Sequence, residues 1–243
     1  MYKVPILALF IVILLPISSS SADSYIDELD QFENWAELHG ISIVGTSKNS
    51  YNLYYSGFDR ETDSVDWREI PDVMIAANAL YTIPENVIKV MDGKTIYFST
   101  EYGRSYTVLG SFPEHGILEG LNRGIILEQN IRSHTVIHEV GHIVDYHGIK
   151  GIYNDEQNIF SNSIDERNLT FNGMDNYQSN SIIPLDEYIS RYSAVNDAEN
   201  FAENFAHYVI HPNEFRERME TDKLLVEEYE FLRENIFTGI EFQ

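Results

Sequence analysis

The pentapeptide HEVGH constrains the fold of this chain more than any other feature of its sequence. Its two histidines, His138 and His142, stand four positions apart, so on an α-helix both side chains project from one face, about one turn from each other. Two imidazoles in that arrangement can bind one metal ion. Glu139 lies beside the pair, where its carboxylate can hold a water molecule bound to that ion. The pentapeptide therefore predicts a helix with a metal site on one face.

The surrounding residues favour a helix over 133–148. Ser133 can cap its amino-terminal end, and Gly148 can end it. Gly141 lies inside this helix, where glycine costs about 1 kcal/mol relative to alanine, which indicates that another element packs closely there. The competing interpretation is a half-buried helix whose two histidines make ordinary hydrogen bonds, since so short a motif also arises by chance.

A zinc site with an open position needs a third protein ligand besides the two histidines. The extended pattern H-E-x-x-H-x-x-G-x-x-H would place one nearby, but here its glycine is replaced by Asp145 and its last histidine by Gly148. His147 is one residue out of place for that role, and we expect it at the surface. The third ligand must therefore come from another part of the chain.

The best candidates are two acids on a helix predicted over 196–212. Glu199 and Glu203 stand four positions apart and so share a face, with small residues between them that would let another helix approach. This helix carries no lysine or arginine, so buried carboxylates on it require a cation or a hydrogen-bond donor. The apolar positions Phe201, Phe205 and Tyr208 are expected to face the core. Spacing does not choose between the two acids: Glu199 could instead form a capping box with Asn196, and Glu203 could face solvent.

The order of predicted elements is mixed first and helical later. Apolar spacing of the helical kind, with caps and stops, predicts helices over 25–39, 84–93, 133–148, 196–212 and 223–237. Short apolar and aromatic runs predict strands over 41–45, 51–57, 95–100, 105–110 and 124–130. Residues 149–184 are rich in Asn, Ser and Asp and are expected to form loops. We therefore predict an α+β fold with a sheet-and-helix lobe over about 23–148, an all-helical lobe over 149–243, and the histidine helix between them.

The first 22 residues have the pattern of a secretory signal peptide. A weakly positive start at Lys3 precedes an apolar run that is shorter than the roughly 20 residues a membrane span needs, and small residues end it at Ala22. We expect cleavage after Ala22 and a secreted chain over 23–243 that forms a single domain; an uncleaved amino-terminal anchor is the alternative. The sequence contains no cysteine, so stability outside the cell must come from packing and from a bound metal.

The net charge of −23 excludes several classes of partner. So acidic a surface repels phosphate backbones and anionic lipids, so we expect no nucleic-acid binding and no membrane binding once the leader is removed. The chain is 43% hydrophobic and 13% aromatic, which separates it from disordered acidic proteins. We expect a monomer whose partner is a peptide or protein substrate, with neutral or basic peptides favoured on approach.

Three blocks of the sequence also resemble a known family. They are HEVGHIVDYHG (138–148), RYSAVNDAENFAENFAHYV (191–209) and, more weakly, EEYEFLRENI (227–236). The chain is similar in these blocks to the zinc metallopeptidases of the gluzincin type that comprise the catalytic domain of anthrax lethal factor and the secreted Pro-Pro endopeptidases. The resemblance extends over the carboxyl-terminal half, whereas the amino-terminal half shares only its α+β character.

The resemblance implies a zincin-like metallopeptidase domain with one Zn²⁺ per chain. It assigns the metal to His138, His142 and Glu199. It makes Glu139 the general base and directs the hydroxyl of Tyr192 at the oxyanion of the reaction.

The same resemblance places Glu203 and Asp145 behind the ligands, as hydrogen-bond partners that orient them. The sequence departs from the family at Asn200 and Asn204, where aromatic or small residues are usual, which leaves the shape of the substrate cleft undetermined.

We therefore expect a secreted zinc endopeptidase that hydrolyses peptide bonds of extracellular or surface proteins. Strand 124–130 is expected to be an edge strand that borders the cleft, and the Gly-rich stretch 110–124 a flap over it. The alternative is a catalytically silent zinc-binding domain of the same fold that binds a protein partner. Glu139 argues against that alternative, because a binding domain needs the metal ligands but not the base.

Overall fold

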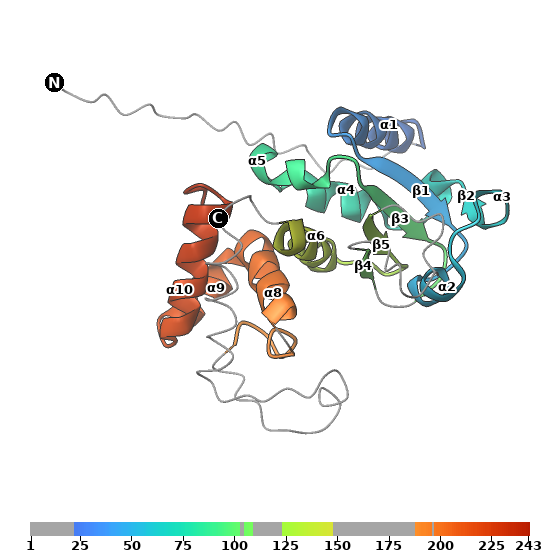
Figure 1. Ribbon diagram of the computed structural model, residues 1–243. Helices are drawn as coiled ribbons and strands as arrows, with labels where there is room; N and C mark the ends of the chain where they lie inside the picture. Colours follow the sequence, from blue (N-terminus) through green and yellow to red (C-terminus); the bar gives the residue numbers. More distant parts are fainter. Residues whose placement is uncertain (1–21, 103–104, 109–122, 148–187, 196) are drawn as a thin grey trace.

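The computed structural model describes residues 22–102, 105–108, 123–147, 188–195 and 197–243. The predicted leader, most of the predicted flap and the Asn-rich stretch 149–184 lie outside these ranges. In the described part of the chain, no helix is both long and apolar enough to cross a membrane. A mixed sheet with covering helices comes first and a group of helices follows, so the α+β prediction is confirmed (Figure 1).

The sheet has five strands in the order β2-β1-β3-β5-β4. Their bounds are β1 Ser42–Thr46, β2 Ser64–Val65, β3 Thr95–Ser99, β4 Tyr106–Val108 and β5 Gly124–Leu127. The three central strands β1, β3 and β5 run parallel, and the two outer strands pair antiparallel with them. Every residue of β3 and β5 is buried, as expected for parallel strands covered on both faces.

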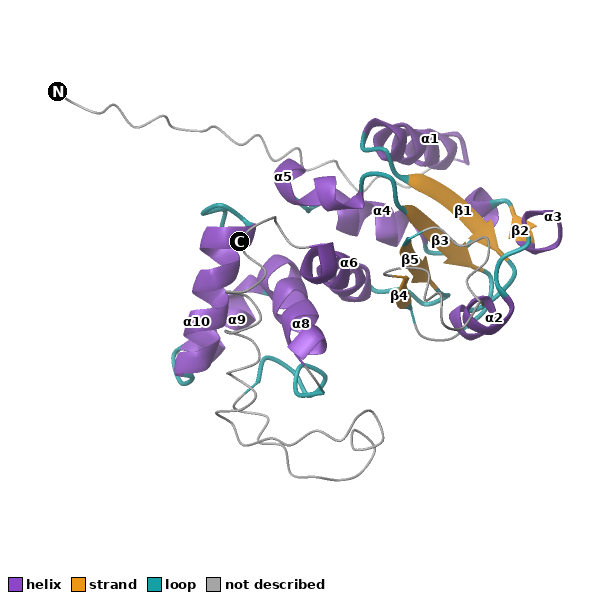
Figure 2. Ribbon diagram, viewed as in Figure 1, coloured by secondary structure: helices purple, strands orange, loops and turns teal. Residues whose placement is uncertain are grey.

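Helices precede, cover and follow this sheet (Figure 2). In the sheet half they are α1 Ala22–Leu38, α2 Ser50–Ser56, α3 Arg60–Asp63, α4 Val73–Tyr81 and α5 Glu85–Ile88, with 3₁₀ turns η1 Trp67–Glu69 and η2 Lys89–Met91. The remaining elements are α6 Ser133–His147, α8 Asp197–Ile210, α9 Pro212–Met219 and α10 Lys223–Phe231, which continues as a π-helical turn, η5, over Leu232–Ile236. The five predicted helices are all present with shifted ends.

The strand predicted over 51–57 is wrong, because these residues form α2. The side chain of Asn49 accepts a hydrogen bond from the backbone N–H of Asn52 at 2.8 Å and caps the helix, which ends at Gly57 with a φ of 68°. Leu53 is fully buried while Tyr51 is 66% exposed. The tyrosines suggested a strand, but the cap and the left-handed glycine fix one short helix between them.

The expectation that 124–130 forms an edge strand is also wrong. Residues 106–108 return antiparallel along the outer side of β5, so β4 is the edge strand and β5 lies between β3 and β4. Pro212 does not simply close α8: it occupies the first turn of α9, where its missing N–H costs nothing.

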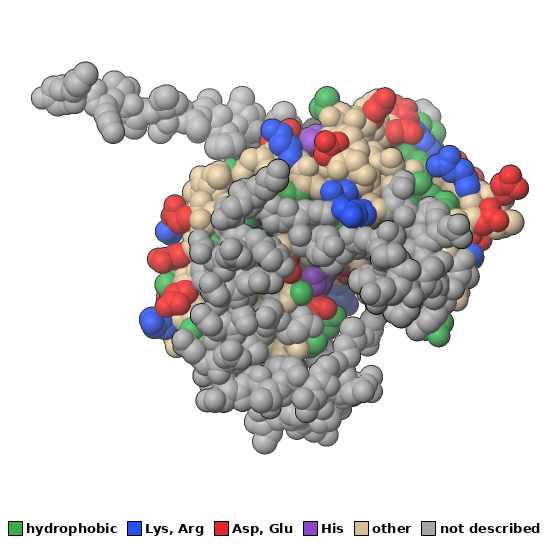
Figure 3. All heavy atoms as spheres, viewed as in Figure 1, with side chains coloured by type: hydrophobic (Ala, Val, Ile, Leu, Met, Phe, Trp, Pro, Cys, Tyr) green, Lys and Arg blue, Asp and Glu red, His purple; other side chains and the backbone are tan. Residues whose placement is uncertain are grey.

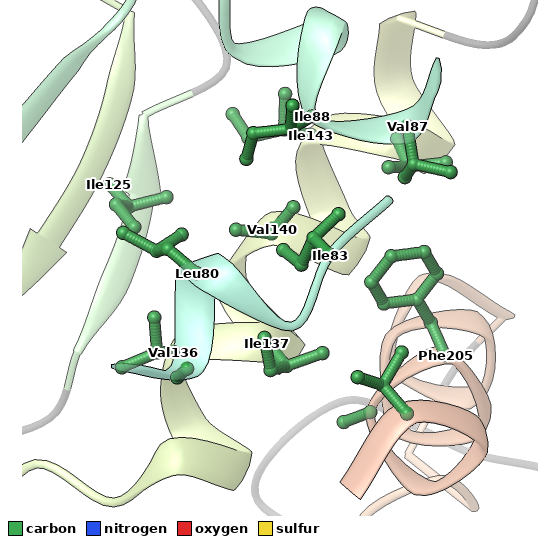
Figure 4. Close-up of a cluster of buried hydrophobic side chains, with 14 of the residues drawn as sticks. Leu80, Ile83, Val87, Ile88, Ile125, Val136, Ile137, Val140, Ile143 and Phe205 are labelled. Atoms are coloured by element: carbon green, nitrogen blue, oxygen red, sulfur yellow. The ribbon is translucent and has the colours of Figure 1, made fainter. Parts of the chain in front are cut away.

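The helix α6 lies between the sheet and the carboxyl-terminal helices (Figure 1), and its apolar face is buried (Figure 4). Aliphatic side chains of α6 pack against the sheet half on one side and against Phe205 of α8 on the other: Val136, Ile137, Val140 and Ile143. A Cβ built on Gly141 would lie 3.0 Å from Cα of Ala202, so the close approach predicted at this glycine is confirmed.

Candidate metal centre

The facing sides of α6 and α8 carry two rows of polar side chains at four-residue spacing. On α6 the row consists of His134, His138 and His142, and on α8 of Glu199, Glu203 and His207. The apolar residues of each helix are buried in the core. Each polar row lies on another side of its helix, where α6 and α8 contact each other. The rows run antiparallel, because the last histidine of α6 meets the first acid of α8.

The first cluster is formed by His138, His142 and Glu199. Nε2 of His138 lies 3.1 Å and Nε2 of His142 lies 3.2 Å from the same carboxylate oxygen, Oε2 of Glu199. The two imidazole rings are nearly perpendicular, with centroids 4.7 Å apart. These three residues could hold a metal ion. Two imidazole nitrogens and one carboxylate oxygen are a donor set that suits zinc.

The pKa values of His138 and Glu199 are shifted in opposite directions by the hydrogen bonds within this cluster. Burial alone would lower the pKa of His138, but hydrogen bonds with Glu199 and Glu203 outweigh it and raise that pKa to about 10. Burial alone would raise the pKa of Glu199, but hydrogen bonds from His138 and His142 lower it to about 2. The cluster therefore strongly attracts positive charge, and a metal ion must displace a proton to bind there.

Glu203 lies behind the first cluster. Its Oε1 is 2.9 Å from Nδ1 of His138, and the residue is only 6% exposed, so the alternative that it faces solvent is wrong. Burial opposes its ionisation, but hydrogen bonds from His134 and His138 lower its pKa well below the usual range. A carboxylate in this position fixes the orientation of the imidazole that it contacts.

Glu139 is buried at 6% exposure and lies beside the edge strand. Oγ1 of Thr107 on β4 is within hydrogen-bond distance of the Glu139 carboxylate and 3.0 Å from the Glu139 carbonyl oxygen. Burial raises the pKa of Glu139, and the neighbouring histidines His142 and His138 oppose that rise in part. A carboxylate whose pKa is raised towards neutrality is a better proton acceptor.

A cleft of about 400 Å³ opens beside these residues. Its described lining includes three carboxylates, those of Glu128, Glu139 and Glu203, and no lysine or arginine. Although β5 is not the edge strand, the residues that follow it, Glu128 to Ile131, border this cleft. The described lining of the cleft is therefore acidic, whereas Figure 3 shows Asp and Glu side chains interspersed with Lys and Arg over the outer surface.

Of the other predicted site residues, Tyr192 contacts the first cluster, whereas Asp145 belongs to neither group of candidate ligands among the described residues. Tyr192 lines the cleft, and its hydroxyl donates a hydrogen bond to Oε1 of Glu199 at 3.1 Å. Asp145 is half-buried on α6 and belongs to neither group of candidate ligands that the described residues form. Asn196, the proposed capping partner, and the side chain of His147 lie outside the described residues.

Sequence reasoning missed a second cluster of potential ligands, His134, Glu203 and His207. The signal was available, because His134 stands four residues before His138 and His207 four residues after Glu203. Burial, and then the neighbouring His134, lower the pKa of His207 to about 4. No sequence signal could have found Thr107, whose contact with Glu139 depends on the position of the edge strand.

Comparisons of the sequence with known protein families and with curated proteins gave no match. The resemblance to the lethal factor and Pro-Pro endopeptidase family therefore rests on the three sequence blocks alone.

Proposed function

We propose that the chain is a zinc-dependent endopeptidase with a zincin-like fold. The observation that carries the proposal is the convergence of His138 Nε2 and His142 Nε2 on one oxygen of Glu199, at 3.1 and 3.2 Å, with Glu139 lining the adjacent cleft. His138, His142 and Glu199 would hold one Zn²⁺.

The bound zinc would supply Lewis acidity, which polarises a peptide carbonyl and makes a water molecule more acidic. Glu139 accepts the proton of the attacking water and passes it to the leaving amine. Thr107 holds the Glu139 carboxylate in place through its hydroxyl. The hydroxyl of Tyr192 transfers its hydrogen bond from Glu199 to the oxyanion that develops on the scissile carbonyl.

The acidic cleft favours neutral or basic peptides. Three carboxylates line it, and the net charge of −23 attracts cationic segments from a distance. An extended peptide can pair with β4, since β4 is the edge strand of the described sheet and contacts the helix that carries Glu139. With the predicted leader removed, the substrates are extracellular or surface proteins.

The test combines zinc analysis with a peptide-library assay of the protein and its Glu139→Gln variant. Gln keeps the shape of the side chain but cannot accept the proton, so cleavage should fall about 10²–10⁴-fold while zinc is retained. The control is Glu37→Gln, which changes an exposed carboxylate on α1 by the same chemistry and should leave cleavage intact.

Each outcome distinguishes between functions. Zinc binding with cleavage that depends on Glu139 would establish the peptidase. Zinc binding without cleavage of any peptide in the library would favour a silent domain that binds a protein partner. Absence of zinc from the unaltered protein would refute the site.

A further inference from the structure

We propose that His134, Glu203 and His207 form a second site for a transition-metal ion, next to the first and separate from it. Nε2 of His134 lies 3.2 Å from Oε1 of Glu203, and Nδ1 of His207 lies 4.0 Å from Oε2 of the same carboxylate. Nδ1 of His207 is also 2.9 Å from the backbone carbonyl oxygen of Glu203, so His207 would bind an ion through Nε2. The potential ligand atoms of all three residues lie within 4.8 Å of one another. The site extends the two rows by one helical turn beyond the first cluster.

The composition of the cluster selects the kind of ion. Two imidazoles with one carboxylate suit Zn²⁺, Co²⁺, Ni²⁺ or Cu²⁺, whereas Mg²⁺ and Ca²⁺ prefer oxygen ligands throughout. The ring of His211 lies near both histidines, with centroids 5.4 Å from that of His134 and 5.3 Å from that of His207. His211 is therefore a third imidazole beside the two proposed histidine ligands.

The hydrogen bonds among the described residues leave one polar atom of the cluster without a partner. Nδ1 of His134 is buried and has no hydrogen-bond partner within the described part of the chain. Buried ring nitrogens are normally satisfied, but Nε2 is the nitrogen of His134 that contacts Glu203, so an ion shared with Glu203 would bind Nε2 and Nδ1 needs a partner of its own. An ion can reach the site from solvent, because His134 and Glu203 both line the cleft.

Glu203 couples the two sites. Its Oε1 contacts His138 Nδ1 at 2.9 Å as well as His134, so the same carboxylate that orients a ligand of the first site is itself a ligand of the second. An ion bound to Glu203 withdraws negative charge from His138. Each ion should therefore weaken the binding of the other, by a factor that is equal in both directions and on the order of tenfold.

The experiment is a titration of the metal-free full chain with Zn²⁺, in millimolar Mg²⁺ that occupies sites made only of oxygens. Bound zinc is counted after equilibrium dialysis, and Co²⁺ absorption reports the ligand set. The unaltered protein should bind two ions, the second about tenfold more weakly. His138→Ala/His142→Ala and His134→Ala/His207→Ala should each bind one ion. His39→Ala, which alters a histidine far from the rows, should still bind two.

Folding of each variant is checked by circular dichroism, and His207→Gln, which keeps a polar side chain of similar size, replaces the double variant if that one unfolds. One bound ion should remain in the His138→Ala/His142→Ala variant and should be lost when His207→Gln is added to it. That result would support the second site even if the protein cleaves no peptide. The proposal is wrong if the unaltered protein binds one ion and loses it only through changes at His138 and His142.

Discussion

Replacing Gly141 with alanine would test how closely α6 and α8 must approach for the two rows to meet. The new Cβ would lie 3.0 Å from Cα and 3.3 Å from the carbonyl oxygen of Ala202, and 3.3 Å from Cδ1 of Phe205. Two of these three atoms belong to the backbone of α8, so the contact is relieved only if a helix moves. Overpacking of this kind costs about 1–3 kcal/mol, and the higher helix propensity of alanine returns about 1 kcal/mol. The expected net loss is roughly 1 kcal/mol, which lowers the Tm of a chain of this size by about 2–4 °C.

The effect of Gly141→Ala on metal binding should be larger than its effect on stability. His138 and His142 flank position 141 on the same helix, and any shift of α6 from α8 changes their distance from Glu199. Metal–ligand distances tolerate only about 0.2 Å, so we expect a drop in zinc affinity of about tenfold. Calorimetric unfolding of the metal-free protein measures the change in stability, and competition with a chromogenic chelator measures the change in zinc affinity.

Gly93→Ala provides a matched control for this experiment. Gly93 has a φ of 70° and no atom within 4 Å of a built Cβ, so alanine there costs about 1–2 kcal/mol through backbone strain alone. Its zinc affinity should be unchanged. If Gly141→Ala instead stabilises the protein by about 1 kcal/mol and leaves zinc affinity intact, the helices do not touch at this position and the reasoning is wrong.

Three further predictions concern other parts of the site and its support. Thr107→Val removes a hydrogen bond that lowers the pKa of Glu139, so the acid limb of the pH–rate profile should move to higher pH; an unchanged limb would mean that Thr107 does not act on the base. In the metal-free protein, His138 has a pKa of about 10, above its unfolded value of 6.5, so its contribution to stability is complete below pH 6.5 and is lost as the pH rises towards 10. Urea unfolding at several pH values should show this decline in the metal-free protein and not in the zinc-loaded one; equal profiles would contradict it. Asn200→Leu removes the 2.8 Å hydrogen bond to buried Glu228 and the 2.9 Å hydrogen bond from Asn204, and should destabilise the protein by about 1–3 kcal/mol, whereas adding Glu228→Leu should recover the part that comes from the unpaired carboxylate. Additive losses in a double-mutant cycle would show that the two side chains are not coupled.

Local periodicity was enough to predict the parts of the site that belong to one helix. The face shared by His138 and His142, and that shared by Glu199 and Glu203, follow from 3.6 residues per turn. The contact between these faces does not, because it depends on how α6 and α8 pack. For that reason periodicity left open which acid meets the histidine pair. The four-residue spacing does place His134 and His207 in the two rows, but only the packing of the helices brings them together with Glu203.

The error about the edge strand has the same origin. The edge position of β4 depends on strand order, which no single segment encodes. Asn200 and Asn204, where the sequence departs from the family pattern, are both fully buried: Asn200 bonds to Glu228 of α10, and Asn204 bonds to Asn200. Through Asn200 this pair contributes to the packing of α8 against α10.

The sequence of α8 affects how the register between α6 and α8 is determined. Residues 199–202 and 203–206 are the same tetrapeptide, ENFA, repeated one turn later. Sliding α8 by four residues, about 6 Å, would bring a second, chemically identical Glu-Asn-Phe-Ala set opposite the histidines. The repeat therefore cannot specify its own register. The register must be set by side chains outside the repeat. Tyr208 is one of them, because its hydroxyl donates a hydrogen bond of 2.7 Å to the carbonyl oxygen of Ile240. Which glutamate faces the histidine pair therefore depends in part on contacts outside the repeat, such as this one near the carboxyl end of α8.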